Sequence, residues 1–150
     1  MVTPTKQSLT ELYETDETAW LDAMATLIRA GRFDEIDCVH LAEFLDDNAQ
    51  RDRWEIYCIM ADFLAGLLVW KHHCDKVTPT RRGEILGKHF DLENWLDTPA
   101  LRKHAEAILH DTYKDAVERA SAEADVAPAS FPPACPWTVV QLLSEEVLHQ

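Results

Sequence analysis

The sequence predicts an all-α fold: a single-domain helical bundle with a central apolar helix and a proline-rich C-terminal strap that ends in a short helix. Residues 37–70 contain no proline and end in an apolar run over residues 59–70. Elsewhere apolar residues recur every three to four positions, and no segment alternates long enough at strand period to predict a sheet. Hydrophobic residues make up 47% of the chain and glycines number only 4, a balance typical of globular helical proteins.

The first helix is expected over residues 9–30. Ser8-Leu9-Thr10-Glu11 matches a capping box, in which serine and glutamate satisfy free amides at a helix start. The apolar pattern then runs to Gly31, which suits a left-handed helix stop. Asp34 or Asp37 is expected to cap the helix that follows.

The long segment 37–71 can form one helix or two in tandem. Its apolar stripe consists of Leu41, Leu45, Ile56, Met60, Leu64 and Leu67. Residues 46–53 are polar on every face, which favours a break or an exposed stretch near Asn48. Residues 56–70 become apolar all round, so this part is expected to be surrounded by the other helices.

Two Thr-Pro pairs, Thr78-Pro79 and Thr98-Pro99, predict the next helix starts, because proline suits the first helical turn. The first of these helices has an expected inward stripe of Ile85, Leu86, His89, Leu92, Trp95 and Leu96. The second is expected to end near Ala124.

Residues 127–137 contain Pro128, Pro132, Pro133 and Pro136. This strap is expected to lie extended across the body, because proline lacks the amide that a helix needs. Its expected anchors are Phe131, Cys135 and Trp137. Thr138-Val139-Val140-Gln141 is a second capping box and predicts a terminal helix to about Val147.

Length and composition favour one domain over residues 1–150. The opening residues lack the apolar core of a signal peptide, and the apolar run 59–70 is shorter than the roughly twenty residues that span a membrane. A cytoplasmic location is therefore expected. Four cysteines without a Cys-x-x-Cys pair are expected to be reduced, small apolar side chains.

The formal net charge is −13 at pH 7, and such an acidic chain disfavours binding to nucleic acid. Residues 71–89 are the exception, with five basic residues against two acidic ones. This basic segment is either a solvated surface that pairs with acidic neighbours or a patch that binds a partner.

Candidate residues for chemistry are few. His72, His73, Cys74 and Asp75 are the densest group of metal-ligand types, but no fixed ligand pair elsewhere completes a site. A carboxylate-bridged di-metal centre is rejected, because only Glu146 and His149 have the Glu-x-x-His spacing. No catalytic, cofactor-binding or metal-binding residue is therefore assigned, and no cofactor is expected.

Asp62 is the one charge whose placement needs an explanation, because it lies within the apolar run. Three environments are considered: solvent, a pocket that raises its pKa, or an ion pair with an arginine such as Arg29 or Arg32. The ion pair is preferred.

Several segments in order carry a family resemblance. They are Leu12-Tyr13-Glu14-Thr15-Asp16, Ala19-Trp20-Leu21, residues 27–37, Leu67-Leu68-Val69-Trp70, Thr98-Pro99-Ala100-Leu101, Tyr113-Lys114-Asp115-Ala116 and residues 131–138. Together they resemble the bacterial family known as domain of unknown function 29. The resemblance implies a compact all-helical bacterial protein without an established activity. This chain departs from the family pattern at Gly66 and Val69, where a histidine and a lysine are usual, and in lacking a tryptophan near Arg81 and Arg82.

Two functions remain. The preferred one is a non-catalytic protein-interaction module that docks an unknown protein or a second copy through residues 71–88 or exposed aromatics such as Trp95. The alternative is a small-molecule or metal-dependent enzyme with a site around His72, His73, Cys74 and Asp75. Neither nucleic acid nor a membrane is an expected partner.

Overall fold

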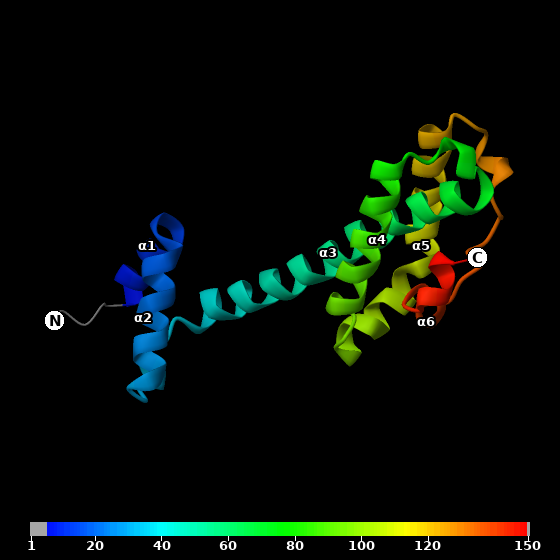
Figure 1. Cartoon of the computed structure of the whole chain (residues 1–150). Helices are drawn as coiled ribbons and strands as arrows, with labels where there is room; N and C mark the ends of the chain where they lie inside the picture. Colours follow the sequence, from blue (N-terminus) through cyan, green and yellow to red (C-terminus); the bar gives the residue numbers. More distant parts are fainter. Residues whose placement is uncertain (1–5, 150) are drawn as a thin grey trace. The chain divides into compact units, whose positions relative to one another are not determined.

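The computed structural model describes residues 6–149, and every regular element in that range is helical (Figure 1). The α-helices are α1 (Lys6–Thr15), α2 (Glu17–Arg29), α3 (Cys38–His72), α4 (Pro79–Trp95), α5 (Pro99–Ala124) and α6 (Val139–Leu142). Short 3₁₀ turns cover Phe33–Glu35, Cys74–Lys76, Pro128–Ser130 and Glu145–Leu148. The predicted all-α class is confirmed.

The chain divides into two compact units, residues 1–50 and 51–150. Each unit has its own cluster of buried apolar side chains. The expectation of a single domain stays a prediction, and one cooperative unfolding transition for the whole chain would be its signature.

Unit 1 differs from the sequence expectation at its first helix. The chain leaves the helix at Asp16, whose carboxylate accepts a hydrogen bond from the Ala19 amide at 3.0 Å and caps α2. The predicted helix 9–30 is therefore two helices, because a local cap interrupts a continuous apolar pattern. Ser8 lies inside α1, so the capping box predicted there is wrong. Gly31 has φ +69° and ends α2 as predicted.

The core of unit 1 consists of Leu9, Trp20, Met24 and Leu27. Asp37 caps α3 by accepting a hydrogen bond from the His40 amide at 3.4 Å, as expected for one of the two candidate caps. Its carboxylate also lies 2.7 Å from Nδ1 of His40. The Tyr13 ring contacts both His40 and Trp20, so polar and aromatic contacts join the three helices of this unit.

Helix α3 runs from Cys38 to His72 without a break. The expected break near Asn48 does not occur, although nearly all of residues 46–55 are exposed. The Asn48 side chain donates to the Phe44 carbonyl at 2.8 Å, one turn earlier, and the helical backbone continues. The part of α3 from Ile56 to Val69 carries the largest group of buried side chains, as the apolar run predicted.

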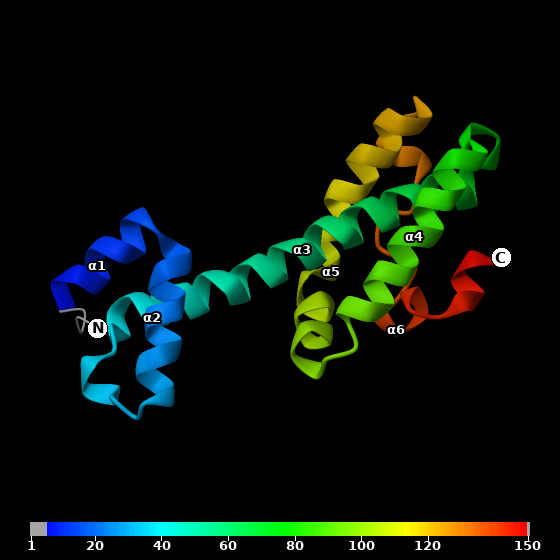
Figure 2. The same cartoon turned by 60° about the vertical axis from the view of Figure 1, so that its left-hand side comes forward.

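Unit 2 is built around that buried part of α3, with α4 and α5 packed against it in both views (Figures 1 and 2). Helix α4 begins at Pro79 with Thr78 as its cap, and α5 ends at Ala124, both as predicted. Asp125 then adopts a left-handed φ of 53° and ends the helix.

The strap after α5 includes one 3₁₀ turn at Pro128–Ser130, so it is not extended throughout. Phe131 is buried, and Cys135 and Trp137 pack against the core, which confirms the three expected anchors. The capping box at Thr138 is confirmed. Helix α6 ends at Leu142, earlier than expected. The Ser144 hydroxyl accepts a hydrogen bond from the Glu146 amide and so caps a separate 3₁₀ turn.

Candidate functional site

The segment His72–Asp75 does not form a cluster of ligands. His72, Cys74 and Asp75 are exposed, and His73 is half-buried. Among residues 6–149, no three histidine, cysteine, aspartate or glutamate side chains lie close enough to share a metal ion. All four cysteines are free thiols; Cys38 and Cys74 are exposed, and Cys58 and Cys135 are half-buried.

The two histidines instead contact the strap. Their rings lie edge-on to Phe131, with ring centres 6.1 Å away for His72 and 5.4 Å for His73. Nε2 of His73 lies 3.3 Å from the Ser130 hydroxyl. These contacts hold the end of α3 against the strap.

Phe131 also lines a surface groove of about 650 Å³ between α5 and the strap. Its lining is Tyr113, Lys114, Val117, Glu118, Pro128, Ala129, Phe131, Pro132 and Pro133. The volume is within the range of small-molecule sites. No residue of His72–Asp75 lines the groove, so the expected reactive group and the cavity are neighbours without forming one site.

Asp62 is paired, as preferred, but with a different arginine. Its Oδ1 lies 3.1 Å from Nη2 of Arg81 on α4, so the suggested partners Arg29 and Arg32 were wrong. The Arg81 guanidinium also lies 2.9 Å from Glu123 and 3.3 Å from Glu84. One of the five basic residues of the segment 71–89 is therefore engaged within unit 2.

Gly66 permits this arrangement. A Cβ atom at this position would lie 2.5 Å from Cγ1 of Ile85 and 3.2 Å from Nη2 of Arg81. Contacts below about 3.0 Å are not tolerated without movement. The absent side chain at Gly66 therefore lets α4 approach α3 closely.

Helix α4 has an uncharged outer face, which we call the α4 face. It consists of Pro79, Gly83, Leu86, Gly87, Phe90 and Asn94, all exposed. Leu86 is 47% exposed and Phe90 is 62% exposed. The buried side chains Ile85, His89 and Leu92 project from the opposite side of the helix. The expectation that Leu86 points inward is therefore wrong.

Packing within residues 6–149 does not require the two glycines of the α4 face. A Cβ atom at Gly83 or Gly87 would meet no atom within 4 Å. Glycine inside an exposed helix costs about 1 kcal/mol relative to alanine. The helix therefore carries a destabilising pair of residues at the centre of its most exposed side.

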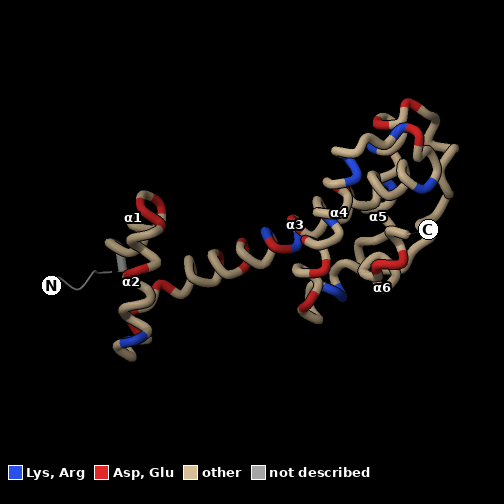
Figure 3. Tube along the Cα trace, viewed as in Figure 1, with Lys and Arg blue, Asp and Glu red and all other residues tan. Residues whose placement is uncertain are grey.

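Charged and uncharged residues are interspersed along the α4 backbone (Figure 3). By helical spacing, the exposed Arg82 and Glu93 border one edge of the α4 face, and the exposed Glu84 and Asp91 border the other. Arg82 lies on one edge, with its guanidinium carbon 5.7 Å from the centre of the Trp70 ring. Trp95, expected to be an exposed docking aromatic, is half-buried and packs against the core. The sequence did contain a signal for the α4 face, namely Gly83 and Gly87 four positions apart beside Leu86 and Phe90.

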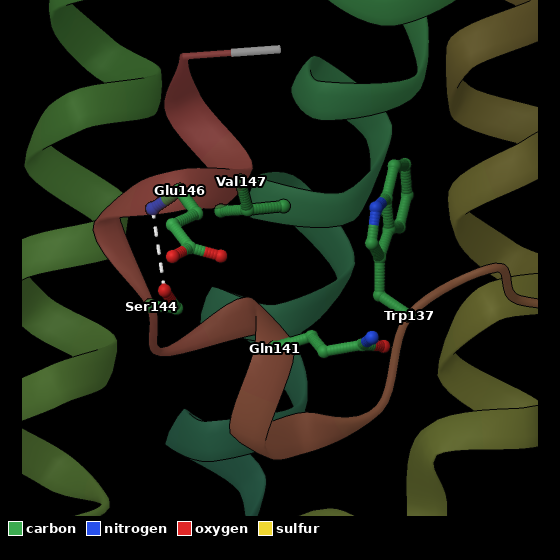
Figure 4. A pocket seen from close by; sticks show the side chains of 5 residues that line it. All are labelled: Trp137, Gln141, Ser144, Glu146 and Val147. Atoms are coloured by element: carbon green, nitrogen blue, oxygen red, sulfur yellow. Dashed lines mark hydrogen bonds between the residues drawn. The ribbon is translucent and has the colours of Figure 1, made fainter.

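A second cavity lies near the C-terminal turns (Figure 4). Its volume is about 80 Å³, and its lining is Trp137, Gln141, Ser144, Glu146 and Val147. This volume is well below the several hundred Å³ of typical ligand sites. It is therefore not a candidate for binding a substrate.

No helix within residues 6–149 is long and apolar enough to cross a membrane. No curated protein and no solved structure shows significant similarity to the chain. The model of one family, described as "Domain of unknown function DUF29", matches residues 12–148, nearly the whole sequence. The chain therefore belongs to this family of unknown function.

Proposed function

We propose that this protein is a non-catalytic protein-interaction module of the bacterial cytoplasm and that it docks its partner through the α4 face. The observation that carries the proposal is the exposure of Leu86 and Phe90 at the centre of a helix face without any charge. Charged residues make up 27% of the chain, so a helix face that only contacts solvent is expected to carry several charged side chains.

The shape of this surface favours a protein over a small molecule. Small-molecule sites are concave, whereas the α4 face is the outside of a helix. Protein interfaces use exposed aromatic anchors surrounded by polar residues, and Phe90 with its charged flanks fits that description. The net charge of −13 disfavours nucleic acid as the partner.

Site-specific photocrosslinking in the cells that make the protein tests this function. A photoreactive phenylalanine analogue at position 90 should form a protein adduct, because Phe90 is expected to be buried against the partner. The same analogue at Val140, which is 66% exposed and lies on α6, is the matched control and should give none. Leu86→Asp should abolish the adduct, because a carboxylate at the centre of an apolar contact loses its hydration. Failure of position 90 to give an adduct above the Val140 control would contradict the proposal.

One observation favours a second candidate, a small-molecule-dependent or metal-dependent enzyme around His72, His73, Cys74 and Asp75. The groove of about 650 Å³ shares Phe131 with the two histidines. Thermal unfolding with zinc, manganese and a nucleotide panel tests it, because a ligand of the folded state raises Tm. The candidate is supported if a ligand raises Tm of the native chain and this rise is lost in Val117→Asp, which alters the groove, or in His73→Ala, which removes one of the histidines. The absence of a rise in Tm with every ligand would contradict it.

A further inference from the structure

We propose that the α4 face binds the α4 face of a second copy of this chain, with the two helices antiparallel about a two-fold axis. This inference rests on the proposed docking function of the α4 face and adds the identity of its partner. It follows from the positions of side chains along α4, which make the face complementary to itself.

The steric fit depends on Gly83 and Phe90. Seven residues bring an α-helix back to within about 20° of the same direction, so the two residues lie on one line along the helix. If the two-fold axis passes between Leu86 and Gly87, Gly83 and Phe90 each lie about 5 Å from the axis along the helix, on opposite sides of it. An antiparallel pair then places the Phe90 ring of each copy over Gly83 of the other, where no side chain occupies the space.

The centre of the same pair fits as well. Leu86 of one copy lies beside Leu86 of the other on one side of the contact line, and the two Gly87 residues meet on the other side. Small residues let two helix backbones approach closely, which brings the leucines and phenylalanines into contact. The arrangement thus uses both glycines, which no contact in the described part of the chain explains.

The charges on one edge of the α4 face favour the same alignment. Arg82 and Glu93 are eleven positions apart, so they project within about 20° of each other from the same edge of the α4 face. In the antiparallel pair, the backbone positions of Arg82 of each copy and Glu93 of the other differ by about 3 Å along the helix, a distance that their long side chains span to form two opposite-charge pairs. On the other edge, Glu84 of each copy lies near the exposed Asp91 of the other, a like-charge contact. Arg81 of its own chain lies 3.3 Å from Glu84 and reduces this repulsion.

A parallel pair does not fit this surface. It would place Phe90, which lies near the contact line, against Phe90 of the other copy, and Gly83 against Gly83, so that no glycine accommodates the ring. Antiparallel helices also align their dipoles favourably. The contact between two helices of 17 residues is small, so the dimer should form reversibly and depend on concentration.

Sedimentation equilibrium of the whole chain over a wide concentration range tests the inference. The native chain should show a reversible monomer–dimer equilibrium. Arg82→Glu and Glu93→Arg should each weaken the dimer about tenfold, and the two together should restore it, because the swap keeps opposite charges side by side. Val140→Asp is the control for a charge placed on another exposed apolar residue, and it should leave the equilibrium unchanged.

Gly83→Ala separates docking from folding. Alanine should raise Tm of the monomer, because it favours the helix and its Cβ meets nothing in the chain. The same Cβ should weaken the dimer several-fold, because it occupies the place of the Phe90 ring. A merely structural role for Gly83 would not move stability and association in opposite directions.

The outcomes distinguish this inference from the proposed function. A monomer at every concentration, together with a position-90 adduct to a different protein, overturns the second copy as partner and leaves the docking function standing. A dimer that tolerates Arg82→Glu, Glu93→Arg and Gly83→Ala overturns the inference as well, since the copies then meet elsewhere. Loss of all adducts at position 90 overturns both.

Discussion

Nη2 of Arg81 on α4 lies 3.1 Å from Oδ1 of Asp62 on α3, and this ion pair joins α4 to the apolar half of α3. The Arg81 Nε also donates to Glu123 of α5 at 2.9 Å. One guanidinium therefore connects the three long helices that form unit 2. The Arg81 side chain is only 17% exposed, so its charge depends on these carboxylates for compensation.

The first prediction is that Arg81→Met lowers the free energy of unfolding by about 2 kcal/mol. Burial acts to lower the pKa of Arg81, but the hydrogen bonds to Glu123 and Asp62 and their charges outweigh burial and raise that pKa. Removal of the cation leaves two partly buried carboxylates facing each other. Their partial exposure to water reduces the cost below that of a fully buried pair. Urea denaturation measures the change.

Two variants control this experiment. Arg119→Met changes an exposed arginine of α5 and should cost less than about 0.5 kcal/mol. Arg81→Lys keeps the charge without the planar fork, so its cost should lie between those of the other two. Equal losses from Arg81→Met and Arg119→Met would show that the contacts of Arg81 add nothing to stability.

The second prediction contrasts two glycines of unit 2. Gly66→Ala should destabilise the fold by about 1–2 kcal/mol, because its Cβ would lie 2.5 Å from Cγ1 of the fully buried Ile85. Gly87→Ala should stabilise the monomer by about 0.5–1 kcal/mol, because its Cβ meets nothing and alanine favours the helix. Thermal unfolding at a concentration where the chain is monomeric measures both. Changes of the same sign would contradict the close approach of α4 to α3.

Local signals in the sequence predicted most of the fold. Helix starts and stops depend on residues only a few positions away, so they could be identified without knowing the tertiary structure. Examples are the stop at Gly31 and the starts at Thr78-Pro79 and Thr138. The central position of residues 56–69 also followed from the sequence, because a helix that is apolar on all sides has to be surrounded. Asp16 shows the limit of prediction from periodicity. The apolar pattern continues through this residue, although its side chain caps a new helix.

The candidate site could not be predicted in the same way. The partner of Asp62 depends on how closely two helices approach, and the space that Gly66 leaves decides this. The direction of Leu86 was misjudged because apolar residues lie on both sides of α4, so periodicity does not fix which side faces the core. His72 and His73 were grouped by adjacency in sequence, whereas Phe131 of the strap decides what they contact.

The third prediction concerns His89, a buried residue of α4. Its Nε2 has no hydrogen-bond partner in the described part of the chain, and its ring centre lies 5.6 Å from that of Phe63. Burial of a polar atom without a hydrogen bond costs about 1–3 kcal/mol. His89→Leu should therefore raise the free energy of unfolding by about 1 kcal/mol in chemical denaturation. His110→Leu changes an exposed histidine and should have almost no effect, whereas a loss of stability from His89→Leu would show that the imidazole is satisfied in solution.

The fourth prediction concerns the Tyr57 hydroxyl on α3, which donates to the Asp115 carboxylate on α5. This hydrogen bond, followed by burial and the negative charge of Asp115, raises the pKa of Tyr57 to about 12. The ordinary value in an unfolded chain is about 10, so the neutral phenol is favoured by folding. Its contribution to stability is therefore fully present below about pH 10 and is lost as the pH rises through about 12.

Tyr57→Phe should lower stability at neutral pH and remove part of the loss that the native chain shows between about pH 10 and 12. Asp115→Asn is the matched variant, because it removes the charge while leaving an acceptor, and it should shift the pKa of Tyr57 back toward its ordinary value. Burial raises the pKa of Tyr113 to about 12 as well, so Tyr113→Phe is needed to assign the ultraviolet titration of the phenols. If Tyr57→Phe leaves the titration curve near pH 12 unchanged, the Asp115 contact does not hold the proton, and the α3–α5 contact is apolar only.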